Sequence, residues 1–317
     1  MASVMRRVWN WLTDRLGRKR AILLVYLLGV GIVALLMNLL MVEGLYHSSL
    51  LYVLIPYLIS VAITFFRGAT EAKSRLGRYI SHLATAITVL FSTSILIGEG
   101  FICILFFAPI YLIVVSFSYA MMALTSNNKK YSLALPAIIL ALSMEGVTPG
   151  LSLPRHTFAE VTVTTSLTPQ EIKQNLAREF TLERDRYWLL SIFPMPYRIE
   201  AGSLNKGDVH RVYTRYHRWF VTNTHEGQAE LLIEEVKENY VKTRVLSDTT
   251  YFSTYLNGTG TEITLTPNDV GGTDVNLKLH YRRNLDPAWY FYPLQKFGVT
   301  KMGELILQQL VVREDPQ

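Results

Sequence analysis

The chain changes character near its midpoint, where long uncharged apolar runs give way to short stretches of alternating apolar and polar residues. The apolar run from Ala21 to Val42 is long enough to cross a hydrocarbon core of about 30 Å as a helix. Four further runs have the composition of membrane-spanning helices: Leu50–Phe66, Tyr79–Ile97, Phe101–Leu124 and Tyr131–Met144. The pattern therefore predicts an all-α transmembrane bundle of about five helices over residues 21–147.

The second half has the element pattern of one α+β domain over residues 158–317. Phe158–Ser166 is rich in Val and Thr, as strands are, and Thr168–Glu171 has the capping-box sequence that begins a helix. A second helix is predicted at Leu182–Leu190. The strands predicted after it are Val209–Phe220, Ala229–Lys237, Tyr240–Leu246, Thr261–Thr266 and Asp274–Arg282.

The last predicted strand and the last helix indicate how this domain is covered. Apolar and polar residues alternate strictly along Asp274–Arg282, which is typical of a sheet with one buried face. A helix from Pro293 to about Val312 follows, and Gly298 and Gly303 inside it indicate that something approaches its backbone closely. We therefore expect a curved antiparallel sheet wrapped around a long C-terminal helix.

This order of elements resembles the helix-grip SRPBCC/START-like superfamily, which includes polyketide cyclase-like and coenzyme Q-binding proteins. The residues that carry the resemblance are Val161–Thr165 before Thr168-Pro169, then Phe193–Pro196, then Gly202–Asp208 and the terminal helix. It covers about Phe158–Val312, and the multi-span first half departs from the usual members. What the resemblance implies is a deep apolar pocket for a lipid-like or polycyclic ligand.

Charge is divided unevenly between the halves. Up to Gly150 there are 12 basic and 5 acidic residues, a net charge of +7, whereas the rest of the chain carries −1. The excess positive charge therefore belongs to the apolar half, and the sequence indicates no nucleic-acid partner. Basic loops alternate with loops that lack Lys and Arg, which places the N-terminus in the cytoplasm of a bacterial inner membrane. Five spans put the second half on the periplasmic side, and four would leave it cytoplasmic.

Shorter segments complete the domain organisation. Residues 1–20 are basic, and their apolar positions are spaced either as an amphipathic interfacial helix or as a simple basic flank. Residues 148–157 form a linker that contains prolines. The ionisable residues His82, Glu99 and Glu145 lie near predicted span ends, where a side chain reaches water at little cost.

The sequence lacks the common catalytic motifs. It has no Gly-x-Ser-x-Gly, no His-Glu-x-x-His, no P-loop and no dinucleotide-binding fingerprint. Its single cysteine, Cys103, can form neither an intrachain disulfide nor a zinc-binding cysteine cluster. We therefore predict no cofactor and no metal.

Candidate ligand-binding residues come from three segments. A regular strand at Val209–Phe220 puts Arg and aromatic residues on one face, which either lines a pocket or forms a solvated outer face. The opposite face, which includes His210, Val212, Thr214, Tyr216 and Phe220, is the alternative lining. The aromatics at 289–292 could form a pocket mouth, an interfacial anchor or core. The predicted ligand-binding set is Tyr213, Arg215, His217, Trp219, Tyr281, Trp289 and Phe297.

These features lead to one function and two alternatives. We expect a membrane-anchored protein that binds a hydrophobic ligand (lipid, quinone or fatty-acid-like) in the helix-grip domain. The first alternative is a cyclase, dehydratase or isomerase that uses His or Tyr in the same cavity for proton transfer. The second is a membrane sensor or assembly module without a ligand, whose helices bind a membrane-protein partner. The sequence leaves open whether the protein is an enzyme.

Overall fold

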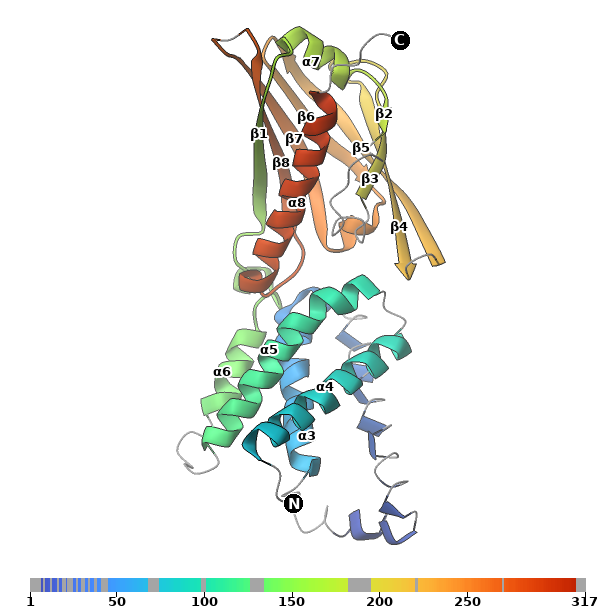
Figure 1. Ribbon diagram of the computed structural model, residues 1–317, viewed down its shortest axis with the longest axis vertical. Coiled ribbons are helices and arrows are strands. Elements are labelled where there is room, and N and C mark those ends of the chain that lie inside the picture. Colours follow the sequence, from blue (N-terminus) through green and yellow to red (C-terminus); the bar gives the residue numbers. More distant parts are fainter. Residues whose placement is uncertain are drawn as a thin grey trace. The chain divides into compact units, whose positions relative to one another are not determined.

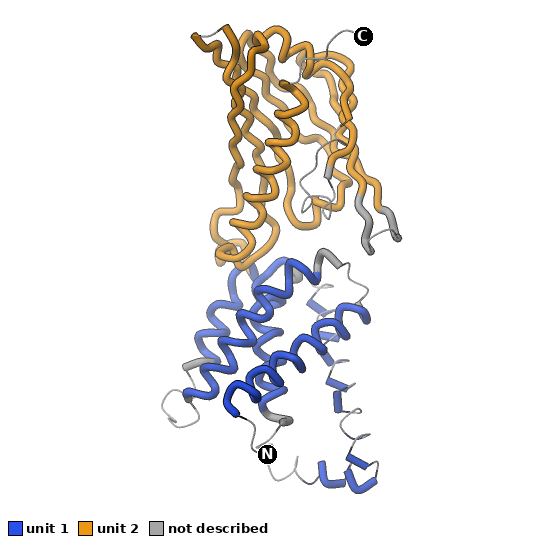
Figure 2. The backbone as a smooth tube through the Cα atoms, viewed as in Figure 1, with its two compact units in different colours: residues 1–147 blue, residues 148–317 orange. Residues whose placement is uncertain are grey.

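The computed structural model describes scattered residues between positions 7 and 40, and then residues 45–67, 74–97, 101–125, 134–181, 195–219, 222–269 and 271–311. The chain forms two compact units, Met1–Val147 and Thr148–Gln317 (Figure 2). Each unit has its own cluster of buried apolar side chains.

The first unit is helical between residues 45 and 143. Two short turns, η1 (Leu45–His47) and η2 (Leu50–Leu54), lead into α3 (Ile55–Arg67). The helices α4 (Arg75–Ile97), α5 (Phe101–Thr125) and α6 (Ala134–Ser143) follow (Figure 1). Helices α3, α4 and α5 pack against one another, and α6 packs against η2. Their shared core is apolar and includes Ile59, Leu90 and Val115.

Two helices among the described residues are long and apolar enough to cross a membrane. They are Arg75–Leu96 in α4 and Ile104–Leu124 in α5, which correspond to the third and fourth predicted spans. Only 33% of the most apolar window of each segment is buried, and large apolar side chains such as Ile95 and Leu124 are exposed. A core helix of a water-soluble protein would bury most of such a segment.

The predicted bundle of five spans is not shown. The second predicted span contains a shorter apolar helix, Leu50–Thr64. Within the described residues the fifth contains α6, whose ten residues extend about 15 Å, half of a typical hydrocarbon core. The first, Ala21–Val42, lies largely outside the described residues, as does most of the predicted segment 1–20.

His82 is placed differently from the expectation that it reaches water at a span end. It lies in α4 and is buried between three helices. Its Nε2 is 3.0 Å from the hydroxyl of Ser60 in α3, and its ring centroid is 4.8 Å from that of Tyr119 in α5. The prediction missed this because the period of α4 turns His82 toward its neighbours, which a count of residues from the helix end does not show. Glu99 lies outside the described residues.

The second unit contains an eight-stranded antiparallel sheet with the strand order β1-β8-β7-β6-β5-β4-β3-β2. Its first strand therefore pairs with its last, and the others form a meander. The strands are β1 (His156–Thr165), β2 (Phe180–Thr181), β3 (Met195–Glu200), β4 (Val209–Trp219), β5 (Thr222–Lys237), β6 (Tyr240–Asp248), β7 (Leu256–Pro267) and β8 (Thr273–Arg283).

The sheet curves around the long helix α8 (Ala288–Leu310), as Figure 1 shows. Helix α8 packs mainly on β1 and β8, and the short helix α7 (Pro169–Leu176) contacts α8 and β7. A curved antiparallel sheet around a C-terminal helix is the helix-grip fold, and this part of the predicted fold is confirmed. The short element η6 (Tyr251–Thr254) connects β6 to β7.

Several local predictions are confirmed atom by atom. Thr168 caps α7, since its hydroxyl accepts a hydrogen bond from the Glu171 backbone and the Glu171 carboxylate accepts one from the Thr168 backbone. The tight β5–β6 hairpin closes with Lys237 opposite Tyr240. The predicted helix Leu182–Leu190 lies outside the described residues.

Helix α8 begins five residues before the predicted start at Pro293. Proline at the sixth position of the helix removes the hydrogen bond that its own N–H would donate, but it leaves the rest of the first turn intact. Pro287 precedes the helix instead. The aromatic segment 289–292 is therefore part of α8 rather than a loop in front of it.

Of the two glycines in α8, only Gly303 meets a close neighbour. A Cβ atom at Gly303 would lie 3.1 Å from side-chain carbons of Leu279 and Val161, whereas one at Gly298 would have nothing within 4 Å. The expected close approach is therefore confirmed at Gly303, where the helix backbone lies on β1 and β8. At Gly298 it is wrong.

Candidate functional site

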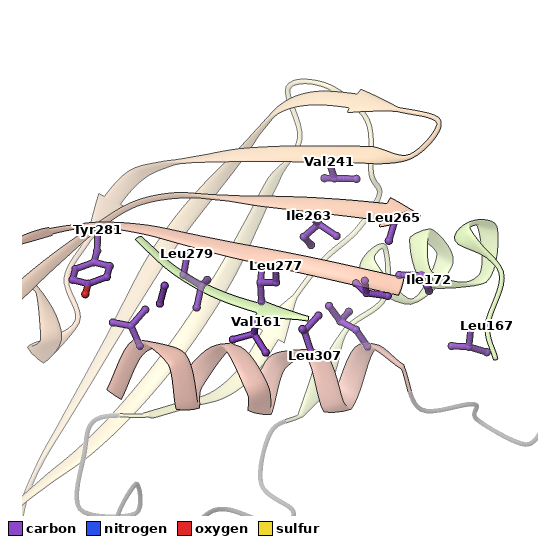
Figure 3. Close-up of a cluster of buried hydrophobic side chains, with 14 residues drawn as sticks. Val161, Leu167, Ile172, Val241, Ile263, Leu265, Leu277, Leu279, Tyr281 and Leu307 are labelled. Atoms are coloured by element: carbon purple, nitrogen blue, oxygen red, sulfur yellow. The ribbon is translucent and has the colours of Figure 1, made fainter. Parts of the chain in front are cut away.

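The two faces of the sheet have different chemistry. In β8, Val275, Leu277, Leu279 and Tyr281 are all buried and face α8, as predicted, while the residues between them are polar and more exposed. Figure 3 shows Leu277, Leu279 and Tyr281 on the α8 side of the sheet. The face toward α8 is called the inner face below.

Half of the inner face is covered by α8 over most of its length. Over β1, β8 and β7, residues such as Ala159, Leu277 and Leu265 are buried beneath α8, which contributes Val299 and Leu307. This region is the hydrophobic core of the unit. Most of its inward side chains are buried, and Val163 and Leu256, which keep intermediate exposure, pack against the same core.

The other half of the inner face, over β4, β5 and β6, is only partly covered. Val212 pairs with Ala229, and Leu231 pairs with Val245. Ala229 and Leu231 lie on the same face of β5 as the buried Ile233, so the register places all four residues on the inner face. All four keep intermediate exposure. These four residues are called the open wall.

One side of α8, with Met302 and Leu305, faces the strands of the open wall. Leu305 is buried against Ile199 of β3, and Met302, Val212 and Phe252 pack around this pair. The contact is much smaller than the core over β1 and β8. Helix α8 is therefore packed tightly against β1 and β8 and more loosely against the strands at the other side of the sheet.

Two buried polar atoms on the inner side have no hydrogen-bond partner within the part of the chain that the structure describes. They are the hydroxyl of Tyr281 in β8 and Oε1 of Gln295 in α8. The amide nitrogen of Gln295 donates a hydrogen bond to the Tyr255 carbonyl at 3.0 Å. Burial raises the pKa of Tyr281 to about 12, so its hydroxyl keeps its proton at physiological pH. Such atoms ordinarily bond to water or a ligand.

The other inward polar groups are satisfied within the protein. His210 of β4 is buried, and its Nε2 lies 2.7 Å from the Ser203 carbonyl. Thr214 donates to the Gly227 carbonyl, and the hydroxyls of Thr243 and Thr261 bond to each other at 2.8 Å. The part of the inner face that is free to contact a ligand is therefore mainly apolar.

Tyr213 and Arg215 of the predicted site lie on the outer face of β4. Arg215 pairs with Glu226 at 3.0 Å, and Tyr213 donates a hydrogen bond to Glu200 at 2.8 Å. Arg211 on the same face pairs with Glu230. This is the solvated outer face that the sequence left open, and the alternative lining with His210, Val212 and Thr214 is the one that faces inward.

We expect Arg215→Ala to change neither the stability of the second unit nor its ligand content. The Arg215–Glu226 pair is exposed on both sides, and such pairs contribute little because water and salt screen them. Thermal unfolding and mass spectrometry of co-purified lipids measure the two effects. A loss of bound ligand in this variant would contradict the prediction and would show that Arg215 contributes to ligand binding.

The remaining members of the predicted set are dispersed. Trp289 and Phe297 are on α8 but face away from the sheet, with 53% and 45% of their surfaces exposed. The side chains of His217 and Trp219 lie outside the described residues. Tyr281 is therefore the only described member that points inward. Val212 of the open wall belongs to the alternative lining expected from the sequence, whereas Ala229, Leu231 and Val245 were missed because their positions become visible only once the strand register is known.

A buried ionic cluster fixes the linker to the start of α8. Asp286, with 0% of its side chain exposed, accepts hydrogen bonds from Arg155 at 2.6 Å and from Ser152 at 2.8 Å. Its second oxygen lies 3.6 Å from Arg283, whose side chain is 1% exposed. Arg283 also donates to the carbonyls of Leu285 and Leu153. We call Arg155, Arg283 and Asp286 the linker clamp.

The described residues contain no group of three or more His, Cys, Asp or Glu side chains placed to bind a metal ion. The linker clamp bonds to the protein's own carbonyls and charges, although Oδ1 of Asp286 accepts no hydrogen bond within the described residues and lies 3.6 Å from Arg283. Among the inward groups, the open wall supplies apolar surface, and Tyr281 and Gln295 supply polar contacts. The arrangement is suited to binding an apolar molecule.

Comparison with known proteins finds similarity only to solved structures, at low sequence identity. No protein-family model and no curated protein matches the chain. Solved structures to which it is similar include the Zhui aromatase/cyclase from Streptomyces sp. R1128, at 15% identity over 49% of this chain and 92% of that one, with a TM-score of 0.33. A START superfamily protein from Mycobacterium smegmatis is 12% identical over 48% and 93%, with a TM-score of 0.33. Ara h 8.0201 is 12% identical over 48% and 99%, with a TM-score of 0.29.

Proposed function

We propose that the protein is a membrane-anchored carrier or receptor that holds a hydrophobic ligand between α8 and the open wall. The observation that carries the proposal is the partial exposure of four apolar residues, Val212, Ala229, Leu231 and Val245, on the inner face of a curved sheet. Apolar side chains at such positions are normally covered by the core. A bound apolar molecule would complete their burial at about 25 cal/mol for each Å² removed from water.

The proposed ligand has a long or polycyclic apolar body and a small neutral polar group. The apolar body matches the open wall, together with Met302 and Phe252 beside it. Tyr281 and Gln295 can each form one more hydrogen bond. The described inward residues offer no unpaired charge to a headgroup. A lipid, a quinone or a similar molecule has this chemistry.

The first unit supports membrane anchoring. Helices α4 and α5 expose large apolar side chains such as Ile95, Ile113 and Leu124, which would be costly in water and favourable in a hydrocarbon core. Anchoring would keep the binding unit near a reservoir of apolar ligands. The basic loops of the sequence favour a cytoplasmic N-terminus, so an odd number of crossings would place the binding unit outside the cytoplasm and an even number inside.

The test compares two neighbouring leucines in β5 that face opposite sides of the sheet. Leu231 belongs to the open wall, whereas Leu232 pairs with Arg244 on the outer face. We expect Leu231→Trp to displace the ligand because the indole occupies the space beside α8, and Leu232→Trp to retain it. The measurement is mass spectrometry of small molecules that co-purify with the full-length chain.

Thermal unfolding of the same two variants provides the control for folding. Equal ligand content in wild type, Leu231→Trp and Leu232→Trp would contradict the proposed site. A wild-type protein that carries no apolar molecule after gentle extraction from the membrane would contradict the function itself.

A further inference from the structure

We propose that the second unit docks on the surface of the lipid bilayer through the end at which the linker enters. The proposal rests on the membrane anchoring proposed above, and it adds a defined contact surface. The linker-end patch consists of Leu151, Leu153, Trp289, Lys296 and Phe297. None of these residues contributes to the open wall.

The linker clamp brings the two parts of the patch together. Ser152 is bonded to Asp286 at 2.8 Å, so Leu151 and Leu153 on either side of it are held beside the turn that begins α8. Trp289 follows Asp286 by three residues. Within the second unit, Figure 1 shows the start of β1 and the start of α8 at the same end. Buried ionic bonds therefore fix the relative positions of apolar residues that are far apart in the sequence.

The patch is apolar and faces solvent. Leu151, Leu153, Trp289 and Phe297 are each between 45% and 59% exposed. Trp289, Pro293 and Phe297 are spaced four residues apart, which puts them on one side of α8, opposite the buried Phe291, Gln295 and Val299. Large apolar side chains gathered on one surface commonly mark a contact with a membrane or another molecule.

The charges around the patch are those that favour a membrane surface. In the two segments that carry the patch, residues 148–159 and 280–303, the only acidic residue is Asp286, which is buried in the linker clamp. Exposed cations in the same segments include Arg282 and Lys296. A basic surface that carries tryptophan and leucine is typical of segments that lie at the headgroup level of anionic bilayers.

The short linker favours the bilayer over a soluble partner as the surface that the patch contacts. Only three residues separate Val147, the last residue of the first unit, from Leu151. A fully extended chain over these four steps reaches about 14 Å at most. If the apolar helices lie in the membrane and Val147 lies at its surface, Leu151 therefore remains within about 14 Å of that surface in every arrangement of the linker.

The experiment uses the full-length chain with Cys103→Ala, reconstituted in nanodiscs of phosphatidylcholine and phosphatidylglycerol. Single cysteines are introduced as Leu153→Cys in the patch, Leu246→Cys on an exposed position of β6, and Ile113→Cys on the outward side of α5. Each cysteine carries a fluorophore, and quenching by a lipid-borne nitroxide is compared with quenching by aqueous iodide.

We expect lipid quenching at positions 113 and 153, and iodide quenching at 246. Adding Trp289→Ser and Lys296→Ser should shift the probe at 153 from lipid to iodide quenching and leave the probe at 113 unchanged. Replacing phosphatidylglycerol by phosphatidylcholine should weaken lipid quenching at 153 alone.

The controls separate the two proposals. Lipid quenching at 113 with iodide quenching at 153 would overturn the docking surface and leave membrane anchoring in place. Iodide quenching at both positions would overturn anchoring as well. Protection of position 153 from both quenchers would indicate a protein partner and would also overturn the proposal.

Discussion

Asp286→Ala is expected to lower the free energy of unfolding of the second unit by about 3–5 kcal/mol. Asp286 is the only carboxylate in contact with two arginines, Arg155 and Arg283, among the described residues. Arg283 is almost completely buried, so the substitution leaves a cation in the interior without a counter-charge. Removing one partner of a buried pair costs far more than the pair itself contributes, because the remaining charge cannot regain water.

Asp286→Asn separates charge from hydrogen bonding in the same cluster. The amide oxygen can still accept from Ser152 and Arg155, so a variant that remains strongly destabilised identifies the lost negative charge as the cause. Hydrogen exchange of the amides in β1 and β8 in the detergent-solubilised full chain measures the second unit alone. The control is Glu226→Ala, which removes an exposed pair and should leave exchange nearly unchanged. Equal effects of Asp286→Ala and Glu226→Ala would contradict the clamp.

Gly303→Val is expected to destabilise the second unit by about 2–3 kcal/mol, while Gly298→Val should be nearly neutral. Both glycines lie inside α8, and the same substitution has the same small effect on helix propensity at either position. They differ in their surroundings. A Cβ atom at 303 would lie 3.1 Å from Val161 and Leu279, whereas position 298 is open.

The added methyl groups at position 303 would have to push α8 away from β1 and β8, the tightly packed edge of the grip. The unfolding midpoint of the two variants in the same detergent measures the difference. A Gly303→Val protein as stable as Gly298→Val would show that the helix lies farther from the sheet than the structure indicates. Ligand content should fall in Gly303→Val as well, because α8 is also the partner of the open wall.

The sequence predicted the helix-grip fold well because its signals are local. The capping box at Thr168, the hairpin at Lys237 and Tyr240, and the alternation through Leu277 and Leu279 each depend on a few neighbouring residues. The start of α8 was missed because proline was interpreted as a first residue, as its missing N–H favours, whereas Pro293 lies at the sixth position of the helix.

The candidate site was less accessible to sequence reasoning. The face of β4 with Tyr213 and Arg215 has the more distinctive chemistry, yet its charges are matched by Glu200 and Glu226 on the neighbouring strands. Only the register reveals those pairs. The open wall consists of ordinary Val, Ala and Leu residues, whose exposure depends on where α8 lies and not on their own identity. The five predicted spans are not shown, since two helices among the described residues are long and apolar enough to cross a membrane and the described part of α6 is ten residues long.

The pairing of β1 with β8 has a consequence for the order in which the protein folds. His156 lies opposite Arg282 in the finished sheet. The ribosome must therefore add 126 residues after His156 before this pair can form. The meander from β3 to β8 can form hairpin by hairpin, whereas closing so long a loop is slow and leaves apolar edges uncovered in the meantime. During synthesis the apolar side of β1, with Ala159 and Val161, would be available to chaperones until β8 and α8 emerge. The second unit therefore acquires its core and its linker clamp together, at the last step of its synthesis.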